Sequence, residues 1–214
     1  GLELAEYAKD ITGTAVDVFV YDTSLDSDSG AWRHRTQATS WYNETLNTAT
    51  RGNRKEFPAV AVIVAETNKL TIYDGDDPAM PMWMVINKGI ATVEVWWYST
   101  RVATCATAMN GEILIGSGID TWGGLRSMNF LSDTLTRRSA AGLYGGLNIA
   151  QRHEATTLTA ISLAGSVLLV NPVVNDVAMT VLPNAPIDPA TGLPVPTIAI
   201  ASDGGVSVIK DDGT

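Results

Sequence analysis

Cysteine and histidine are scarce in this sequence, and their scarcity excludes several kinds of site. Cys105 is the only cysteine, so the chain has no internal disulfide and no thiolate cage for a metal. The two histidines, His34 and His153, are too few for an ordinary structural zinc site. Neither histidine lies in a sequence context that indicates a catalytic triad.

Long apolar runs and an excess of basic residues are also missing. No run reaches the ~18 apolar residues of a membrane-spanning helix, and the first residues lack the basic and apolar regions of a signal peptide. We therefore expect no membrane insertion. The chain has 14 Lys plus Arg against 23 Asp plus Glu, a formal charge of −9. Such a surface repels phosphate backbones, so we expect no nucleic-acid partner.

The clearest positive feature is a pattern that occurs at residues 61–77 and again at 197–213. Each copy reads as an alternating apolar run, a polar turn, a second alternating run and an acidic turn. Alternation with a period of two is typical of a half-buried strand, and Asn68, Gly204 and Gly205 in the central turns tolerate positive φ. Residues 102–116 contain two further alternating runs around Asn110-Gly111, a strong hairpin signal. All three segments are therefore predicted to be β-hairpins.

Repeated hairpins predict an all-β fold. A lone hairpin cannot bury its apolar face, so hairpins stack on one another, as in propeller blades. We expect a β-propeller-like array of repeated hairpins, with a β-sandwich as the alternative. Residues 1–214 are predicted to form a single β-repeat domain, and a first residue that is Gly rather than Met indicates a processed chain or a fragment of a longer one.

The remaining segments vary in how clearly they indicate structure. Residues 1–10 leave a helical turn and an extended arm open. Residues 132–153 predict an irregular loop, or a short helix followed by a loop, because glycines and polar residues break the pattern. The prolines of residues 183–196 predict an extended connector. Further strands are predicted at residues 16–21, 82–86, 92–98, 125–131, 158–174 and 177–182.

Six tryptophans are many for a chain with three phenylalanines. Trp32, Trp41 and Tyr42 lie in a polar segment, where exposed aromatic faces could bind a sugar ring or a partner, with burial between sheets as the alternative. The neighbouring Arg33 and Arg35 are included in this predicted site, although solvated faces or ion pairs explain them equally. Three other tryptophans lie in apolar runs and are predicted to be core or subunit interface: Trp83, Trp96 and Trp97.

Clustered carboxylates are candidates for a cation site. Asp26 and Asp28 resemble the start of a calcium loop, but the twelfth position of that loop would be Gln37. Asp74, Asp76 and Asp77 gather near a proline turn, with ordinary turn formation as the alternative. No cofactor is expected otherwise. A glycosidase would need a carboxylate pair, for which Asp76, Asp77, Glu94 and Asp120 are candidates, but no spacing selects one and no catalytic residue is assigned.

A resemblance to known proteins is carried by residues 17–23, 30–36, 39–44, 57–65, 72–78, 82–84, 174–194 and 204–213. These stretches resemble large proteins of marine bacteriophages that look like virion proteins with propeller-type repeats. The resemblance covers most of the chain and is least clear at residues 132–153. It implies a tail or tail-fibre location, and members usually continue beyond the point at which this sequence ends. No catalytic residues are carried over from it.

The resemblance and the β repeats together predict a tail-associated virion structural protein that acts in subunit assembly or host-surface contact, without catalysis. Its expected partners are further copies of the chain, other virion proteins or a bacterial surface glycan. Two alternatives are a carbohydrate-binding or depolymerase module and a capsid decoration protein.

Overall fold

The computed structural model describes residues 15–87, 102–118, 123–154, 158–162 and 168–213, and these residues form three antiparallel sheets. Short 3-10 helices lie between some strands: η1 (Thr23–Leu25), η2 (Ala31–Arg35) and η3 (Ile149–Gln151). Sheet A contains β1 (Ala15–Asp22), β2 (Val60–Glu66), β3 (Lys69–Asp74) and β4 (Met82–Asn87). Sheet B contains β5 (Val102–Met109), β6 (Glu112–Gly118), β7 (Gly124–Asn129), β8 (Thr134–Arg138), β9 (Leu143–Leu147) and β10 (Thr159–Ser162). Sheet C contains β11 (Val174–Thr180), β12 (Thr197–Ser202) and β13 (Gly205–Ile209).

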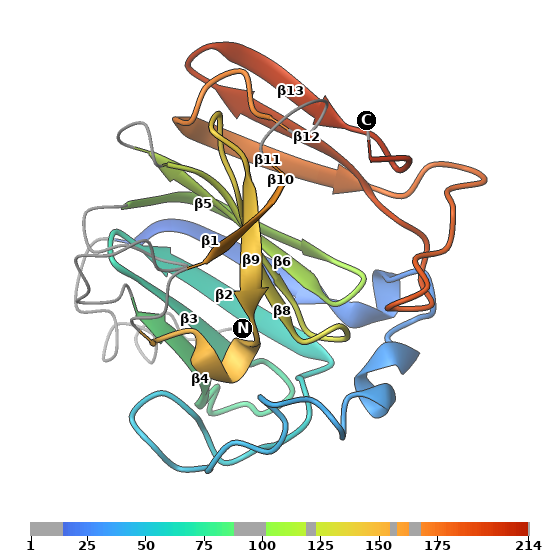
Figure 1. The fold of residues 1–214 in the computed structure, drawn as a ribbon. Coiled ribbons are helices and arrows are strands. Elements are labelled where there is room, and N and C mark those ends of the chain that lie inside the picture. Colours follow the sequence, from blue (N-terminus) through green and yellow to red (C-terminus); the bar gives the residue numbers. More distant parts are fainter. Residues whose placement is uncertain (1–14, 88–101, 119–122, 155–157, 163–167, 214) are drawn as a thin grey trace.

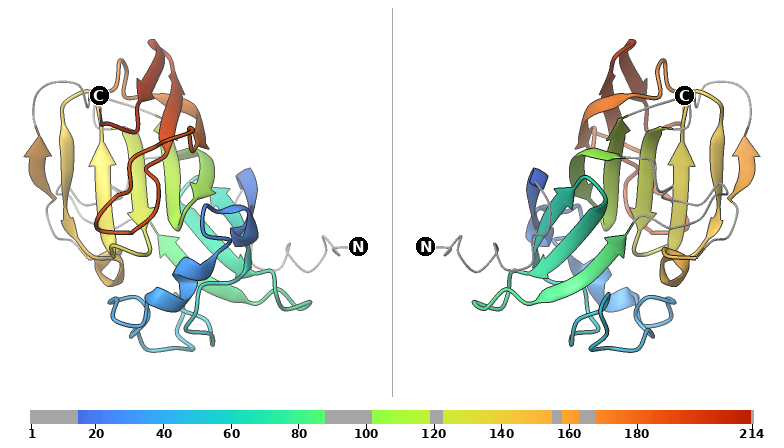
Figure 2. Two further views of the ribbon diagram at one scale, coloured as in Figure 1. Left: turned by 90° about the vertical axis from the view of Figure 1, so that its right-hand side faces the viewer. Right: turned by 90° about the vertical axis from the view of Figure 1, so that its left-hand side faces the viewer.

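The chain is all-β and sandwich-like. Each strand pairs with its neighbours in sequence order, so every sheet is a meander, and none of the three closes on itself within the described residues. In all views sheet C, in orange and red, lies at the top and sheet A, in blue to green, lies below it (Figure 1, Figure 2). The edge strand β1 of sheet A approaches β5 of sheet B, where the amide of Ala106 donates to the Asp17 carboxylate at 2.8 Å. None of the described helices is long and apolar enough to span a membrane.

The main core lies between sheets A and B and is rich in aromatic rings. Alternate residues of β2, namely Ala61, Ile63 and Ala65, enter it, as the period of two predicts. At its centre Phe57 lies 4.9 Å from Trp83 and 4.8 Å from Phe130 between ring centroids, in edge-on geometry. Such edge-on pairs add about 0.5–1.5 kcal/mol beyond the area they bury. The prediction that Trp83 belongs to the core is confirmed.

A second core forms where sheet C packs on the outer face of sheet B. Val174, Ile200 and Ile209 of sheet C meet a face formed by Cys105, Leu114 and Leu125. Gly116 lies at this contact, and a Cβ there would come within 2.5 Å of Cys105 Sγ and 2.8 Å of a Val174 methyl group. The sheets therefore approach closely at a position that only glycine can occupy without movement of its neighbours.

The three predicted hairpins are confirmed as β2–β3, β5–β6 and β12–β13. In the β5–β6 turn Asn110 and Gly111 have φ of 52° and 75°, the left-handed values that the Asn-Gly signal predicts. The strands predicted near residues 16–21, 82–86, 125–131 and 177–182 correspond to β1, β4, β7 and β11, and β10 lies within 158–174. The predictions for residues 1–10 and 92–98 concern segments outside the described residues.

The prediction of an irregular loop at residues 132–153 is wrong. This segment holds β8 and β9 of sheet B and then η3. In β8 Leu135 and Arg137 are both buried, so the alternation includes an arginine that reads as polar in the sequence. In β9 Gly145 and Gly146 occupy strand positions and hide the period, although Tyr144 and Leu147 are buried.

The connector at residues 183–196 is not extended. The amide of Asp188 donates to the carbonyl of Leu193 at 2.9 Å, and the amide of Val195 donates to the carbonyl of Pro186 at 2.9 Å. Gly192, with φ of 70°, lets the chain turn back between these bonds. The segment, which we call the proline loop, therefore folds back on itself and reaches from sheet C down to the β5–β6 turn (Figure 1).

Candidate functional site

Trp32 and Trp41 are not surface recognition residues, so this part of the sequence prediction is wrong. Both side chains are 0% exposed. The indole of Trp32 donates to Asp26 Oδ2 at 2.7 Å, and that of Trp41 donates to the Phe130 carbonyl at 2.9 Å. Each ring thus has its polar atom satisfied and its apolar body in the core. The polar sequence around the two tryptophans predicts exposed side chains. In η2 and the following turns, however, only single residues point into the core, so no apolar run marks them in the sequence.

The other three residues of that predicted site stabilise the same segment. Tyr42 is half-buried, with its ring 5.9 Å from that of Trp41. Arg33 donates to the Phe57 carbonyl at 3.0 Å, and Arg35 donates to the Thr191 carbonyl of the proline loop at 2.8 Å. Their part in binding a partner stays a prediction.

Asp26 and Asp28 are engaged by protein donors rather than arranged as a calcium loop. The hydroxyl of Tyr21 donates to Asp26 Oδ2 at 2.5 Å, and the amide of Asn110 donates to Oδ1 at 2.7 Å. Burial raises the pKa of Asp26, although these hydrogen bonds oppose the shift. Asp28 pairs with Arg35 at 3.2 Å. The Asp26 carboxylate therefore fixes the β5–β6 turn against β1 and η2.

Asp74 and Asp76 converge as predicted, but on an arginine. Arg54 Nη1 lies 2.9 Å from Asp74 Oδ1 and 2.7 Å from Asp76 Oδ2. Asp76 also accepts from the amides of Ala59 and Val60, both at 2.8 Å. Burial alone would raise the pKa of Asp76, but these donors outweigh it and the net shift is downward.

Asp77 accepts from the amide of Ala79 at 2.9 Å, as an ordinary turn residue does. Across the part of the chain that the structure describes, no three Asp, Glu, His or Cys side chains are grouped to hold a metal ion. The predicted cation sites are therefore better explained as turn and ion-pair structure. Four further candidate residues lie outside the described residues, so nothing is concluded about them: Glu94, Trp96, Trp97 and Asp120. Trp122 lies outside them as well.

A buried ionic cluster of Glu44, Arg51 and Arg152 was not predicted. Arg51 Nε lies 3.5 Å from Glu44 Oε2, and Arg152 bonds the other oxygen of the same carboxylate. The guanidinium of Arg51 also stacks 4.2 Å from the centroid of the Trp83 ring. Burial lowers the pKa of Arg51 to about 10, with the Glu44 charge opposing the shift and that of Arg152 adding to it. Separations of up to 108 residues leave no local sequence signal for such a cluster.

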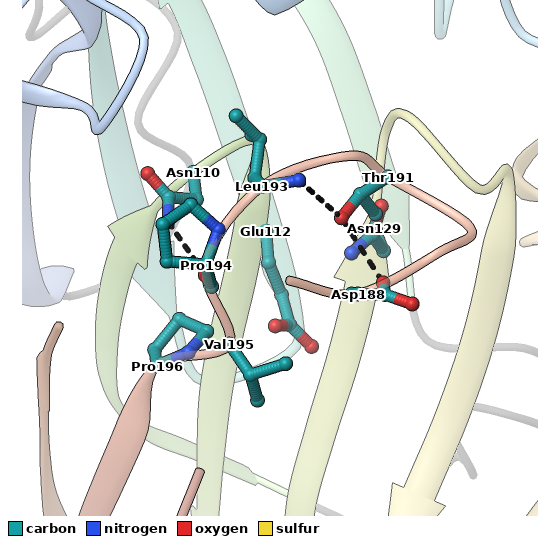
Figure 3. A pocket seen from close by; sticks show the side chains of 9 residues that line it. All are labelled: Asn110, Glu112, Asn129, Asp188, Thr191, Leu193, Pro194, Val195 and Pro196. Atoms are coloured by element: carbon teal, nitrogen blue, oxygen red, sulfur yellow. Dashed lines mark hydrogen bonds between the residues drawn. The ribbon is translucent and has the colours of Figure 1, made fainter. Parts of the chain in front are cut away.

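A small pocket lies between the β5–β6 turn and the proline loop (Figure 3). Its volume is about 80 Å³, well below the ~300 Å³ at which small-molecule sites begin. Asn110 closes one side by donating to the Pro194 carbonyl at 3.0 Å, and Asp188 accepts from the Thr191 hydroxyl at 3.0 Å. In Figure 3 the carboxyl group of Glu112 projects from β6 toward the loop residues Val195 and Asp188.

Glu112 is the residue of this pocket with acid–base potential. Its pKa is raised, first by burial and also by the charge of Asp188, while Ser127 and Arg138 act in the opposite direction. The pocket has room for ordered water but not for a sugar ring, and its hydrogen bonds attach the proline loop to the β5–β6 turn.

Comparison with known proteins gives no family assignment. The sequence matches no protein-family profile, and no curated protein sequence is significantly similar to it.

Proposed function

We propose that this chain is a structural protein of a bacteriophage virion, associated with the tail, and that it acts through contacts with other protein subunits or the host surface. The resemblance to phage proteins supports the virion setting. The charged and aromatic residues that are described serve mainly to hold the fold: the aromatic rings fill the core, and Arg51, Arg54 and Arg152 are paired with carboxylates. This favours a scaffold over an enzyme.

The observation that carries the proposal is a pair of exposed apolar stripes on edge strands. On β13, at the edge of sheet C, Val206 is 67% exposed and Val208 is 52% exposed. On β1, at the edge of sheet A, Val16, Val18 and Val20 are 43–57% exposed. Edge strands that show β-branched residues to water are prone to pair with other chains, and proteins usually protect them. In a virion, neighbouring subunits would cover such strands.

We also propose that the sheets are arranged as in a β-propeller. Sheet A supports it, because four antiparallel strands in sequence order are the composition of one propeller blade. The six strands of sheet B exceed a single blade, so a propeller reading would divide that sheet between neighbouring units.

The test is the mass of the purified chain in solution, measured by size exclusion with light scattering over a range of concentrations. We expect a closed oligomer, since symmetric assemblies reuse one interface. The double variant Val206→Lys, Val208→Lys should lower the mass to that of a monomer while the melting temperature stays unchanged. Leu25→Lys is the matched control, because Leu25 is an 83% exposed apolar residue outside the strands and its replacement should leave the oligomer intact. A wild-type chain that stays monomeric at every concentration would contradict the assembly role.

A further inference from the structure

A second pocket lies on the face of sheet A that points away from the main core. Its volume is about 260 Å³, just below the ~300 Å³ at which small-molecule sites begin and enough for one small ring. The lining comes from three places, β3, β4 and the loop at Ala49: Ala49, Lys69, Thr71, Tyr73, Met82, Val85 and Asn87. Figure 1 shows β3 and β4 side by side, and they form the floor.

The walls of this pocket are held by backbone hydrogen bonds. The amide of Val85 donates to the Thr50 carbonyl at 3.0 Å, and the amide of Gly52 donates to the Trp83 carbonyl at 2.9 Å. These bonds attach the loop that carries Ala49 to the edge of β4. A Cβ on Gly52 would come within 2.1 Å of the Met82 carbonyl oxygen, so the loop lies as close to the strand as glycine permits.

Thr71 is the feature that indicates a ligand. Its side chain is 2% exposed, and its hydroxyl oxygen is buried without a hydrogen-bond partner. Its cross-strand neighbours are Val64 and Val85, which offer no polar side-chain atom. A buried hydroxyl without a partner is destabilising, and native proteins rarely retain one without a reason. A ligand in the pocket that the hydroxyl lines would supply the missing bond.

The charges around Thr71 narrow the class of ligand. Lys69 Nζ lies 2.8 Å from Glu66 Oε2, and the Glu66 side chain is 1% exposed, so the ammonium charge is already matched by a carboxylate. Among the described residues that line the pocket, an anion would therefore meet no uncompensated positive charge, and a cation would meet no uncompensated negative one. An apolar ligand would leave the Thr71 hydroxyl without a bond.

We infer that this pocket binds a neutral, hydroxyl-bearing ring, such as one sugar unit of a glycan. Tyr73, Met82 and Val85 would contact the CH face of the ring. The Thr71 hydroxyl, the Asn87 side-chain amide and the Lys69 ammonium group would bond its hydroxyl groups. Such a site could supply a host-surface contact, but the inference rests on the pocket and not on membership of a virion.

Binding is tested by NMR on protein with methyl-labelled threonine, titrated separately with glucose, galactose, mannose and N-acetylglucosamine. We expect at least one sugar to shift the Thr71 methyl signal in a saturable way. Thr71→Val keeps the shape of the side chain and removes only the hydroxyl, so the affinity for that sugar should fall about five- to tenfold. The melting temperature of this variant should be unchanged or higher, because no hydrogen bond of the free protein is lost.

Thr134→Val on β8 is the control, since Thr134 is an exposed strand threonine far from this pocket in the strand order, and its replacement should leave sugar affinity unchanged. Acetate and cyclohexanol serve as an anion and as an apolar ring with a single hydroxyl. The inference is overturned if no sugar gives a saturable shift, if Thr71→Val binds as tightly as the wild type, or if acetate or cyclohexanol binds more tightly than every sugar.

Discussion

At the scale of single residues, the polar groups that define this molecule are those in its interior. Asp26 joins Tyr21, Trp32 and the Asn110 amide, and Glu44 joins two arginines. A buried charge is tolerated when it is paired and hydrogen-bonded, and removing one partner leaves the other uncompensated. These carboxylates therefore matter to folding, although in the sequence they resemble surface residues.

Glu44→Gln should destabilise the protein strongly. The change removes a carboxylate that pairs with both Arg51 and Arg152, whose side chains are 1% and 2% exposed. We expect the free energy of unfolding to fall by about 3–5 kcal/mol in urea denaturation, the usual effect of breaking a buried ion pair. Glu56→Gln is the control: its partner His34 has a 63% exposed side chain, so the loss should stay below about 1 kcal/mol. Equal effects of the two substitutions would show that burial does not govern these pairs.

His153 should make stability depend on pH. Burial first, and then the charge of Arg152, lowers the pKa of His153 from 6.5 to about 4, and its Nε2 accepts from the Asn87 amide at 3.1 Å. Between pH 6.5 and about 4 the unfolded chain therefore binds a proton that the folded chain does not, and stability falls as the pH is lowered through this window.

His153→Gln keeps an acceptor for the Asn87 amide but does not titrate. The variant should lose less stability than the wild type between pH 6.5 and about 4, measured as the urea midpoint at a series of pH values. Parallel pH profiles of the two proteins would mean that His153 titrates normally in the folded chain.

At the scale of elements, turn chemistry and alternation made the hairpins predictable.

Gly111→Ala should test how firmly the β5–β6 turn is fixed. Gly111 has φ of 75°, and a Cβ there would lie 2.3 Å from Leu131 Cδ1 and 3.1 Å from the Trp32 ring. Strain at positive φ and the clash with a buried ring should together lower the free energy of unfolding by about 2–4 kcal/mol.

Gly192→Ala is the matched control for this turn. Gly192 has a similar φ of 70°, but its nearest neighbour is the flexible end of Arg35 at 3.1 Å. We expect it to cost only the strain of the backbone, about 1 kcal/mol. If thermal unfolding shows the same loss for both variants, the contact with Trp32 contributes nothing to the turn.

Sequence patterns do not predict the structure where a strand lacks regular alternation, or where a residue's contacts come from distant parts of the sequence. The hairpins were readable because Asn110-Gly111 and Gly204-Gly205 act locally. Strand β9 was hidden by its two glycines, and β8 by the buried Arg137. The turn in the proline loop depends on bonds such as that from Arg35 to Thr191, which are 156 residues apart. The burial of Trp32 and Trp41 likewise depends on residues supplied by other parts of the chain.

The candidate binding sites were even less predictable than the elements. The sequence predicts recognition residues among aromatic side chains and metal ligands among clustered aspartates, whereas the pocket at Thr71 is marked by a buried hydroxyl without a hydrogen-bond partner. An alternating strand sequence shows that Thr71 faces outward from the core, but not that its hydroxyl lacks a partner. The pocket beside this hydroxyl becomes visible only when β4 and the Ala49 loop are packed against β3.

At the scale of the whole molecule, the sheets differ in how much of their surface is covered. Sheet B has sheet A against one face and sheet C against part of the other. Sheets A and C each present valines to solvent on an edge strand, β1 and β13 respectively. This distribution fits the proposed role as a subunit with two separate contact surfaces, and the net charge of −9 fits the expectation that its partners are not nucleic acids.

The central claim, that this chain is a structural component of a virion, is tested most directly by mass spectrometry of purified phage particles that encode it, with immunogold labelling by an antibody to the chain. We predict that its peptides are recovered in many copies per particle and that gold lies along the tails. Particles that contain no trace of the chain, while infected cells contain it in quantity, would contradict the account.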